Sequence, residues 1–385
     1  MDYQLSETQV MIRDLCRQIA EEKVKPVREH YDETGEFPWD IVKIFADSDL
    51  FGLFIEEKYG GSGGATMDLV IAVEELSKVC SGIALALAAT ALGTYPIILC
   101  GSEEQKQKYL PKIAKGTLAA FALTEPEAGS DAAGVKTTAV KDGDSYVLNG
   151  TKQWITNGGE ADIYTVIAMT DKTKGARGAS AFIVEKGTPG FTFGKKENKM
   201  GIRASATREL IFQDCRIPKE NLILREGLGF VVAMKTLDKS RPGVAAQALG
   251  IAAGALNEAV AYSRQRRQFG KPICSFQGLQ FMLADMGTQV EAARALVYAS
   301  ARHIDSGAKD ISRASAMAKL FASDTAMSVT TDAVQILGGY GYMKEYPAEK
   351  MMRDAKITQI YEGTNQIQRE VIALNMIKES ASAKK

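Results

Sequence analysis

Asp144-Ser145-Tyr146-Val147-Leu148-Asn149-Gly150-Thr151-Lys152-Gln153-Trp154-Ile155-Thr156-Asn157 is the stretch of this chain that decides its fold. Tyr146 and Leu148 lie two positions apart, which is the period of a strand and not of a helix. The dipeptide Asn149-Gly150 is typical of the two-residue turn of a hairpin. The stretch therefore predicts paired antiparallel strands in the middle of the chain.

Further strand-like runs follow, and clusters of turn residues such as Thr188-Pro189-Gly190 and Gly175-Ala176-Arg177-Gly178 separate them. These runs are 162–169, 179–185, 191–193 and 208–212. The middle of the chain therefore reads as an antiparallel sandwich or barrel of about a hundred residues.

Both flanks of this β region carry the 3.6-residue period of helices. Ser6 with Gln9 predicts a capping box, and an apolar stripe from Ile12 to Ile19 stops before Pro26. The glycine-rich loop 59–64 lacks the spacing of a phosphate-binding loop, so we expect a flexible connection there. Further helical segments are expected at about 38–50, 67–80, 82–99, 244–261 and 313–327.

The order helical, β, helical gives an α+β fold of three domains. We expect an N-terminal helical domain at 1–119, a middle antiparallel β-barrel or sandwich domain at 120–228, and a C-terminal four-helix bundle at 229–385. Strands and helices do not alternate, which argues against a doubly wound dinucleotide fold. A large cofactor would then bind in the cleft between the β domain and a helical bundle.

Composition excludes several classes of function. Lys plus Arg and Asp plus Glu number 47 each, so a nucleic-acid partner is disfavoured. The best apolar run, 83–92, is too short to span a membrane, and residues 1–4 do not resemble a signal or transit peptide. Five scattered cysteines favour a reducing compartment, and we expect a cytoplasmic protein. With only two histidines, we expect no metal site, and proton chemistry falls to a carboxylate.

The candidate carboxylate is Glu362, in the stretch Tyr361-Glu362-Gly363-Thr364-Asn365-Gln366. Asn365 with Gln368 predicts a cap at the start of a helix, which puts Glu362 in the loop before it. Two interpretations stay open on these residues alone. Glu362 is either a solvated loop glutamate or a general base whose pKa is raised by desolvation beside Tyr361, with Gly363 admitting a ligand to the backbone.

Four other segments also allow two interpretations each. The segment 121–131, FALTEPEAGSD, offers the hydroxyls of Thr124 and Ser130 to a ligand, or is only a rigid turn. Trp154 and Thr156 form a flat wall on one strand face, or belong to the core. The cations of 266–271, RRQFGK, neutralise a pyrophosphate or end a helix, and the glycines of 335–341, QILGGYG, approach a ligand or cap a helix.

These segments, in this order and at these spacings, resemble the acyl-CoA dehydrogenase family of flavoenzymes. The motifs FALTEPEAGSD, WITNGG, RRQFGKPI, QILGGYGY, EYP and RDAKITQIYEGTNQIQR carry the resemblance, which extends from the first helices to about Ala373. Within the family, the chain is most similar to the short-chain, butyryl-CoA-dehydrogenase-like branch.

The resemblance implies noncovalently bound FAD, an acyl-CoA substrate and a trans-2-enoyl-CoA product. Glu362 would take the α-proton while the β-hydride passes to flavin N5, and the Glu362 amide would help to polarise the thioester carbonyl. It also implies fatty acid metabolism, electron-transferring flavoprotein as the electron acceptor, and a homotetramer built as a dimer of dimers.

The resemblance also assigns binding residues. Substrate would contact Ser130, Asp238, Arg241, Tyr361 and Gly363. FAD would contact Phe121, Leu123, Thr124, Ser130, Trp154, Thr156, Thr364 and Gln366, and the FAD of the neighbouring subunit would contact Arg266, Phe269, Gln277, Gln335 and Gly339.

Some alternatives remain within this resemblance. Certain branches place the base at the position that Ser240 holds here, with glycine at the later site. In this chain the earlier site is serine and the later one is glutamate, so Glu362 is the only candidate for the base. The chain could also work as an enoyl-CoA reductase, as an acyl-CoA oxidase, or as a noncatalytic assembly scaffold. The small side chains of 84–93 would line the acyl tail and could admit a compact or cyclic acyl group, or they could serve only helix packing.

Overall fold

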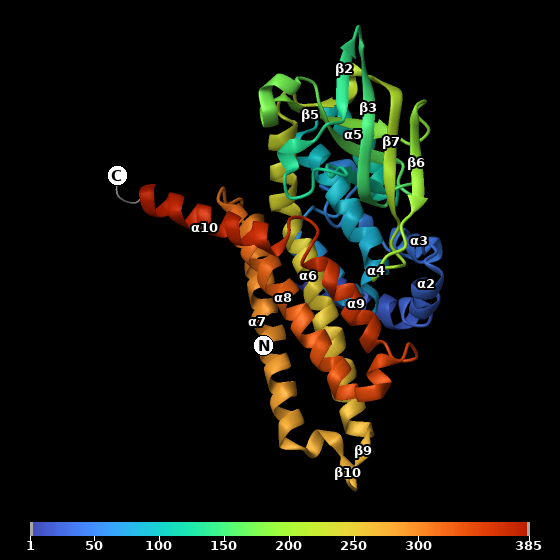
Figure 1. The fold of residues 1–385 in the computed structure, drawn as a ribbon, viewed down its shortest axis with the longest axis vertical. Helices are drawn as coiled ribbons and strands as arrows, with labels where there is room; N and C mark the ends of the chain where they lie inside the picture. Colours follow the sequence, from blue (N-terminus) through green and yellow to red (C-terminus); the bar gives the residue numbers. More distant parts are fainter. Residues whose placement is uncertain (1–2, 383–385) are drawn as a thin grey trace.

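The computed structural model describes residues 3–382, and its elements follow the order helical, β, helical (Figure 1). The sheet lies at one end of the molecule, and the long C-terminal helices form a bundle that extends away from it. The α+β fold class is confirmed.

The N-terminal part is helical. Ser6 and Gln9 form the predicted capping box, and Ile12, Cys16 and Ile19 are buried on one face of the first helix. Its helices are α1 Glu7–Ile19, a π-helical turn at Ala20–Val24, α2 Arg28–Thr34, α3 Trp39–Asp47, α4 Thr66–Cys100 and α5 Glu103–Ala114.

The middle part is one sheet with the strand order β6-β7-β3-β2-β4-β5-β8, and β1 pairs with β4. Most pairs are antiparallel, but β1–β4 and the single β2–β4 pair are parallel. The strands are β1 Ala119–Ala122, β2 Thr138–Asp142, β3 Ser145–Thr156, β4 Ile163–Met169, β5 Ala179–Glu185, β6 Phe191–Lys196, β7 Thr207–Pro218 and β8 Leu222–Ile223.

The hairpin predicted at Asn149-Gly150 is wrong. Strand β3 continues through both residues, and the β2–β3 connection is instead at Gly143 and Asp144. The pairing of β3 with β7 shifts register between Leu148 and Gly150, which is the mark of a β-bulge. Gly150 has φ +143, and a Cβ on it would lie 2.6 Å from Thr137 Oγ1. The glycine therefore serves a close backbone approach within a strand, not a turn.

The C-terminal part consists of long helices and a small hairpin. Its elements are α6 Gly229–Gln265, β9 Arg267–Gln268, β10 Lys271–Pro272, α7 Gln277–Asp305, α8 Ile311–Leu337, α9 Ala348–Thr358 and α10 Asn365–Ser382.

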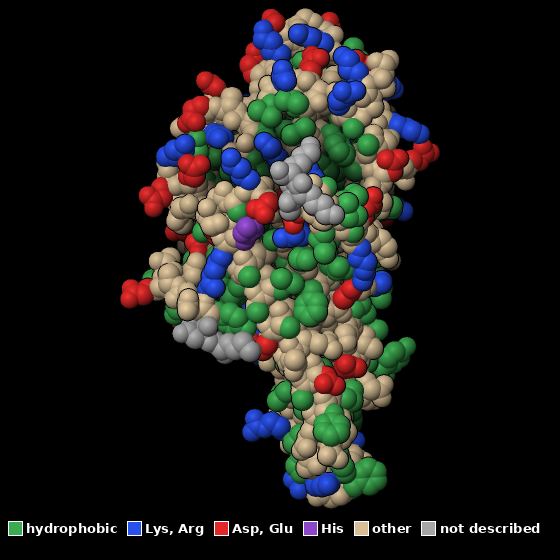
Figure 2. Space-filling view, turned by 90° about the vertical axis from the view of Figure 1, so that its left-hand side faces the viewer, with side chains coloured by type: hydrophobic (Ala, Val, Ile, Leu, Met, Phe, Trp, Pro, Cys, Tyr) green, Lys and Arg blue, Asp and Glu red, His purple; other side chains and the backbone are tan. Residues whose placement is uncertain are grey.

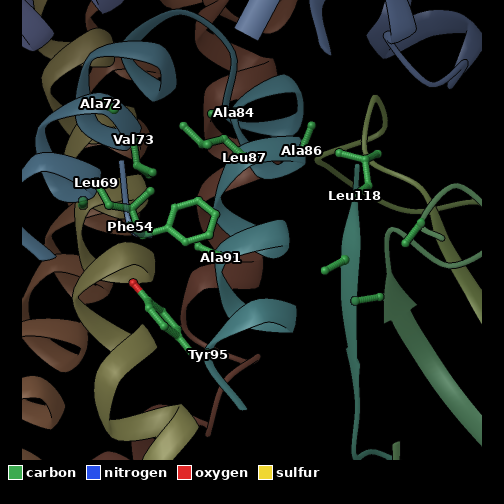
Figure 3. Packing of buried hydrophobic residues seen from close by; sticks show 14 of the residues in the cluster. Phe54, Leu69, Ala72, Val73, Ala84, Ala86, Leu87, Ala91, Tyr95 and Leu118 are labelled. Carbon is green, nitrogen blue, oxygen red and sulfur yellow. The ribbon is translucent and has the colours of Figure 1, made fainter. Parts of the chain in front are cut away.

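The core joins α4 to α6. The two helices predicted at 67–80 and 82–99 correspond to α4, which is interrupted at Cys80 by non-helical φ −153° and ψ 102°. Phe54, Leu69, Leu87 and Tyr95 pack inside it (Figure 3). Windows of α4 and α6 are apolar enough to cross a membrane, but 78% and 72% of these windows are buried inside the protein, as in core helices.

The glycine-rich loop differs from the flexible connection that we expected. Gly61, Ser62 and Gly63 donate backbone hydrogen bonds to the carbonyls of Glu56, Gly52 and Ile55. A Cβ on Gly61 would lie 2.0 Å from the Ile55 carbonyl oxygen, so the loop is a tightly folded turn.

Candidate active site

Glu362 lies in the loop between α9 and α10, where the backbone is strained. Its φ is +51°, and Gly363 follows at φ +90°. A left-handed conformation is uncommon for a residue with a Cβ, and it persists only where surrounding contacts enforce it. Gln368 Nε2 supplies such contacts, because it donates to the carbonyls of Glu362 at 3.1 Å and of Gly363 at 2.9 Å.

The cap of α10 differs from the one predicted. Thr364 is the capping residue, since its Oγ1 accepts from the Ile367 amide at 3.3 Å. The Asn365 side chain instead turns toward α8 and contacts Lys319, Ser323 and Asp324. Gln368 does reach back across the loop, as predicted, but to carbonyls and not to the amide of a capping residue.

The electrostatic surroundings of Glu362 support a base and not a solvated loop residue. Burial raises the pKa of this carboxyl, while Ser240, Arg241 and Lys319 act in the opposite direction. Ser240 Oγ donates to Glu362 Oε2 at 2.5 Å. The carboxylate is thus desolvated but held by one hydrogen bond and two nearby cations.

The Tyr361 ring is fixed by a chain of buried side chains. Its hydroxyl donates to Gln247 Oε1, and Gln247 Nε2 donates to Ser81 Oγ at 2.6 Å. Ser81 directly follows the interruption of α4 at Cys80. These two long-range hydrogen bonds connect the loop before Glu362 to both core helices.

Two cavities meet at Glu362. The apolar cavity, about 370 Å³, lies along α4 and α6, and the tryptophan cavity, about 540 Å³, lies between Trp154, the segment 197–202 and α9. Both are lined by Thr124, Gly129, Ser130, Trp154, Thr156, Tyr361, Glu362 and Gly363. The carboxylate therefore stands where a molecule in one cavity can touch a molecule in the other.

The apolar cavity contains the stretch predicted to line an acyl tail. Leu85, Ala88, Ala89 and Leu92 line it at helical spacing. Opposite them, α6 supplies Phe230, Met234, Leu237, Ser240, Arg241, Gly243 and Val244. The stretch thus lines an apolar space that extends to Glu362, with alanines and leucines on its α4 side.

Trp154 is not a core residue. Its side chain is 56% exposed, and its φ of +55° coincides with a second register shift between β3 and β7. The irregular backbone turns the indole into the cavity, with Thr156 nearby on the same wall. Of the two interpretations of these residues, the flat wall is the one that fits.

The loop after β1 is both a rigid turn and part of the site. Glu125 accepts from the Lys136 amide at 2.6 Å, the Thr137 amide at 3.0 Å and the buried Lys152 Nζ at 2.7 Å. This anchor presents Thr124 and Ser130 to both cavities. Phe121 and Leu123 line the apolar cavity as well.

The remaining candidates lie in different places. Asp238 pairs with Arg241 at 2.6 Å, and Arg241 lines the apolar cavity whereas Asp238 lines neither cavity. Thr364 lines the tryptophan cavity, whereas Gln366 is exposed and lines neither cavity.

Five candidates lie at the far end of the bundle: Arg266, Phe269, Gln277, Gln335 and Gly339. Phe269 is 92% exposed in the turn between β9 and β10, and the Arg266 guanidinium stacks over Tyr340 at 5.3 Å. This narrow end, which is rich in apolar side chains, is visible in Figure 2. A single chain does not bring these residues to Glu362.

Sequence reasoning missed three residues that hold the site in place, namely Lys319, Gln247 and Lys152. Each is a long polar side chain that is nearly or completely buried, and Lys319 and Gln247 stand within apolar segments. Long polar residues are rarely buried without a partner, so such a position is the signal that could have identified them.

Three family models match the chain in succession. They describe the N-terminal domain of acyl-CoA dehydrogenase at residues 6–117, its middle domain at 120–215 and its C-terminal domain at 227–377. A short-chain-specific acyl-CoA dehydrogenase of Clostridium acetobutylicum is 52% identical over 375 residues, 97% of this chain and 99% of that protein. An acryloyl-CoA reductase (NADH) of Anaerotignum propionicum is 51% identical over 381 residues, 98% and 96% of the two chains.

Solved structures agree with these matches. Butyryl-CoA dehydrogenase from Megasphaera elsdenii superimposes with a TM-score of 0.96 and 52% identity, over 98% of this chain and all of that one. A chain from a study of the electron transferring flavoprotein of Acidaminococcus fermentans has a TM-score of 0.95 and 55% identity, over 98% and 99%. With all three domains matched, and with relatives about half identical over nearly their full length, the chain belongs to the acyl-CoA dehydrogenase family.

Proposed function

We propose that this chain oxidises the Cα–Cβ bond of a short or compact acyl-CoA to a trans-2-enoyl-CoA, with Glu362 as the base. The observation that carries the proposal is the position of Glu362 at the junction of the apolar and tryptophan cavities. An acyl chain in the first cavity would present its α-carbon to the carboxylate and its β-carbon to a flat ring in the second.

The residues present fit FAD. Trp154 offers an exposed ring face, and the hydroxyls of Thr124, Ser130 and Thr156 have no hydrogen-bond partner within residues 3–382 although they line the cavities. Such free hydroxyls suit a ligand rich in carbonyl and ring-nitrogen groups. Family members are FAD-dependent, and FAD, when bound, supplies the acceptor for the β-hydride.

Glu362 takes the α-proton onto a carboxylate oxygen, and the electrons of the Cα–H bond form the double bond as the β-hydride leaves. An α-C–H is a very weak acid, so the thioester oxygen needs hydrogen bonds that stabilise developing negative charge. The Glu362 amide has no acceptor within the described residues and is free to donate such a bond. The hydrogen bond from Tyr361 to Gln247 fixes the position of the loop that carries this amide and the carboxylate.

The same site run in reverse, as an enoyl-CoA reductase, is the second candidate. The acryloyl-CoA reductase relative favours it. In that direction Glu362, with its raised pKa, would deliver a proton to the α-carbon. Geometry is identical in both directions, so only the reduction potential of the bound flavin and the supply of reductant distinguish them.

The family and the residues at the far end of the bundle suggest an electron acceptor and an oligomeric state. We propose electron transferring flavoprotein as the electron acceptor. The support is the very similar chain in the structure that concerns the electron transferring flavoprotein of Acidaminococcus fermentans. A homotetramer would give the residues at the far end of the bundle a function, by bringing Arg266 and Phe269 to a neighbour's FAD. All five cysteines are free thiols, which supports a cytoplasmic location.

The test is an anaerobic titration of the purified flavoprotein with acyl-CoAs of increasing length and branching. The proposal expects flavin absorbance to bleach with a short or compact acyl-CoA. A holoenzyme that no acyl-CoA bleaches, but that is rapidly reoxidised by an enoyl-CoA after chemical reduction, would favour the reductase.

A further inference from the structure

Lys319 on α8 is a fully buried cation directly beneath the loop that carries Glu362. Its Nζ donates to the Gly363 carbonyl at 2.8 Å and to Asn365 Oδ1 at 2.9 Å. The Gly363 carbonyl thus accepts two side-chain donors, Lys319 and Gln368. Together they hold the two residues with positive φ that set the direction of the carboxylate.

Lys319 has no carboxylate within ion-pair distance in the described part of the chain. The charged groups that face it are Glu362 in the loop, Arg241 on α6 and Asp324 on its own helix. Asp324 is already engaged by Asn365 and by Arg369 of α10. Glu362 is the remaining negative charge, and it exerts the strongest electrostatic influence on Lys319.

A buried ammonium with only neutral hydrogen-bond acceptors is expensive for the fold, and an apolar side chain of similar volume would be the more stable choice. Its presence therefore points to a role beyond packing. The ammonium stabilises the ionised form of the proposed base, because a desolvated carboxylate is otherwise driven toward its neutral form.

We propose that Lys319 is a positioning residue for the proposed base: its ammonium holds the Glu362–Gly363 turn through the Gly363 carbonyl and keeps the carboxylate ionised. This inference rests on the proposed function of Glu362. It adds a long-range electrostatic contribution from α8 to the hydrogen bond that Ser240 donates.

The pKa shifts of Lys319 and Glu362 determine the pH range in which Lys319 acts on the carboxylate. Burial lowers the pKa of Lys319 to about 7, and the charge of Lys319 lowers the pKa of Glu362 against the larger effect of burial. Below that pH the ammonium is present and favours the carboxylate. Above it the ammonium is lost, and its help to Glu362 disappears.

Exchange of the α-protons of acetyl-CoA in D2O tests the inference on the holoenzyme. Acetyl-CoA has α-protons but no β-carbon, so no hydride can leave, and mass spectrometry of the thioester reports the base alone. The exchange rate falls as pH drops through the pKa of Glu362, and this falling part of the profile is the acid limb. In Lys319→Met the midpoint of the acid limb should move to a pH about one unit higher, so that exchange at a given pH on the limb is about tenfold slower. The two profiles should converge above neutral pH.

Two further variants separate charge from packing. Lys319→Gln keeps a donor but has no charge, and it should show the same upward shift with a smaller loss of thermal stability. Ser323→Ala removes the hydroxyl that accepts from Asn365 Nδ2 at 2.9 Å and carries no charge, so it should lower the melting temperature without moving the limb.

The inference is overturned if Lys319→Gln keeps the wild-type limb, or if Ser323→Ala moves the limb as far as the lysine variants do. Failure of the proposed function looks different, because the wild-type holoenzyme itself would then neither exchange α-protons nor be reduced by any acyl-CoA.

Discussion

At the residue scale, the chemistry depends on one carboxylate that three different elements control. Ser240 of α6 donates to it, Lys319 of α8 faces it, and Gln368 of α10 holds its backbone. Burial pushes its pKa up, and these contacts limit the rise. Burial thus makes the carboxylate a stronger base, and Ser240, Arg241 and Lys319 favour its ionised form.

Replacement of Ser240 should move the pH profile of flavin reduction. The hydroxyl stabilises the carboxylate, so Ser240→Ala should raise the pKa of Glu362 further, and the acid limb should shift upward by about one unit. Since the base must be deprotonated, the rate below the limb falls. Stopped-flow reduction across pH measures this, with Ser240→Thr, which retains a hydroxyl, as the control. A limb that does not move in Ser240→Ala would contradict the assigned hydrogen bond.

At the element scale, the loop after β1 depends on a buried ion pair. Lys152→Met leaves the Glu125 carboxylate without its cation, and removing one partner of a buried pair typically destabilises by about 3–5 kcal/mol. We therefore expect easier denaturant unfolding and weaker FAD retention, because Glu125 anchors the loop that presents Thr124. Lys136→Met removes an exposed pair with Glu127 and should leave both measurements unchanged. Equal stability of the two variants would refute the anchoring role.

The contact between α4 and α6 requires glycine at two positions of α6, Gly250 and Gly254. A Cβ on Gly254 would lie 2.1 Å from the Lys78 carbonyl oxygen, so Gly254→Ala should destabilise the protein by about 1–3 kcal/mol through a backbone shift. Gly287 lies in α7 with nothing within 4 Å of such a Cβ, so Gly287→Ala should be neutral or stabilising. Chemical denaturation of both variants gives the comparison, and a stable Gly254→Ala would show that the helices can separate at little cost.

Periodicity predicted most of these elements and failed where backbone geometry overrides it. The break in α4 at Cys80 separates two helices that the sequence divides at the same place. Asn149-Gly150 was misleading, because the same dipeptide that makes a turn also relieves a close approach to Thr137. The motifs predicted Glu362, Trp154 and the α4 lining, but not Lys319, since its role depends on which helix lies beneath the loop, and that is a property of tertiary packing.

At the scale of the whole molecule, the candidate FAD residues divide into two groups at opposite ends of the C-terminal bundle. Arg266 lies far from the two cavities of its own chain, so within a single chain Arg266→Ala should leave FAD binding unchanged. In the proposed tetramer it should lower FAD occupancy, measured as the flavin-to-protein absorbance ratio after gel filtration. Full occupancy in a tetrameric Arg266→Ala protein would exclude a contribution across subunits.

The most direct test of the account compares wild type with Glu362→Gln in an anaerobic mixture with the best acyl-CoA. The amide keeps the shape of the side chain but cannot accept the α-proton as a carboxylate does. We predict a variant that retains FAD and reduces it more slowly by about three orders of magnitude or more. Near-normal bleaching of the flavin in Glu362→Gln would contradict the assignment of the base.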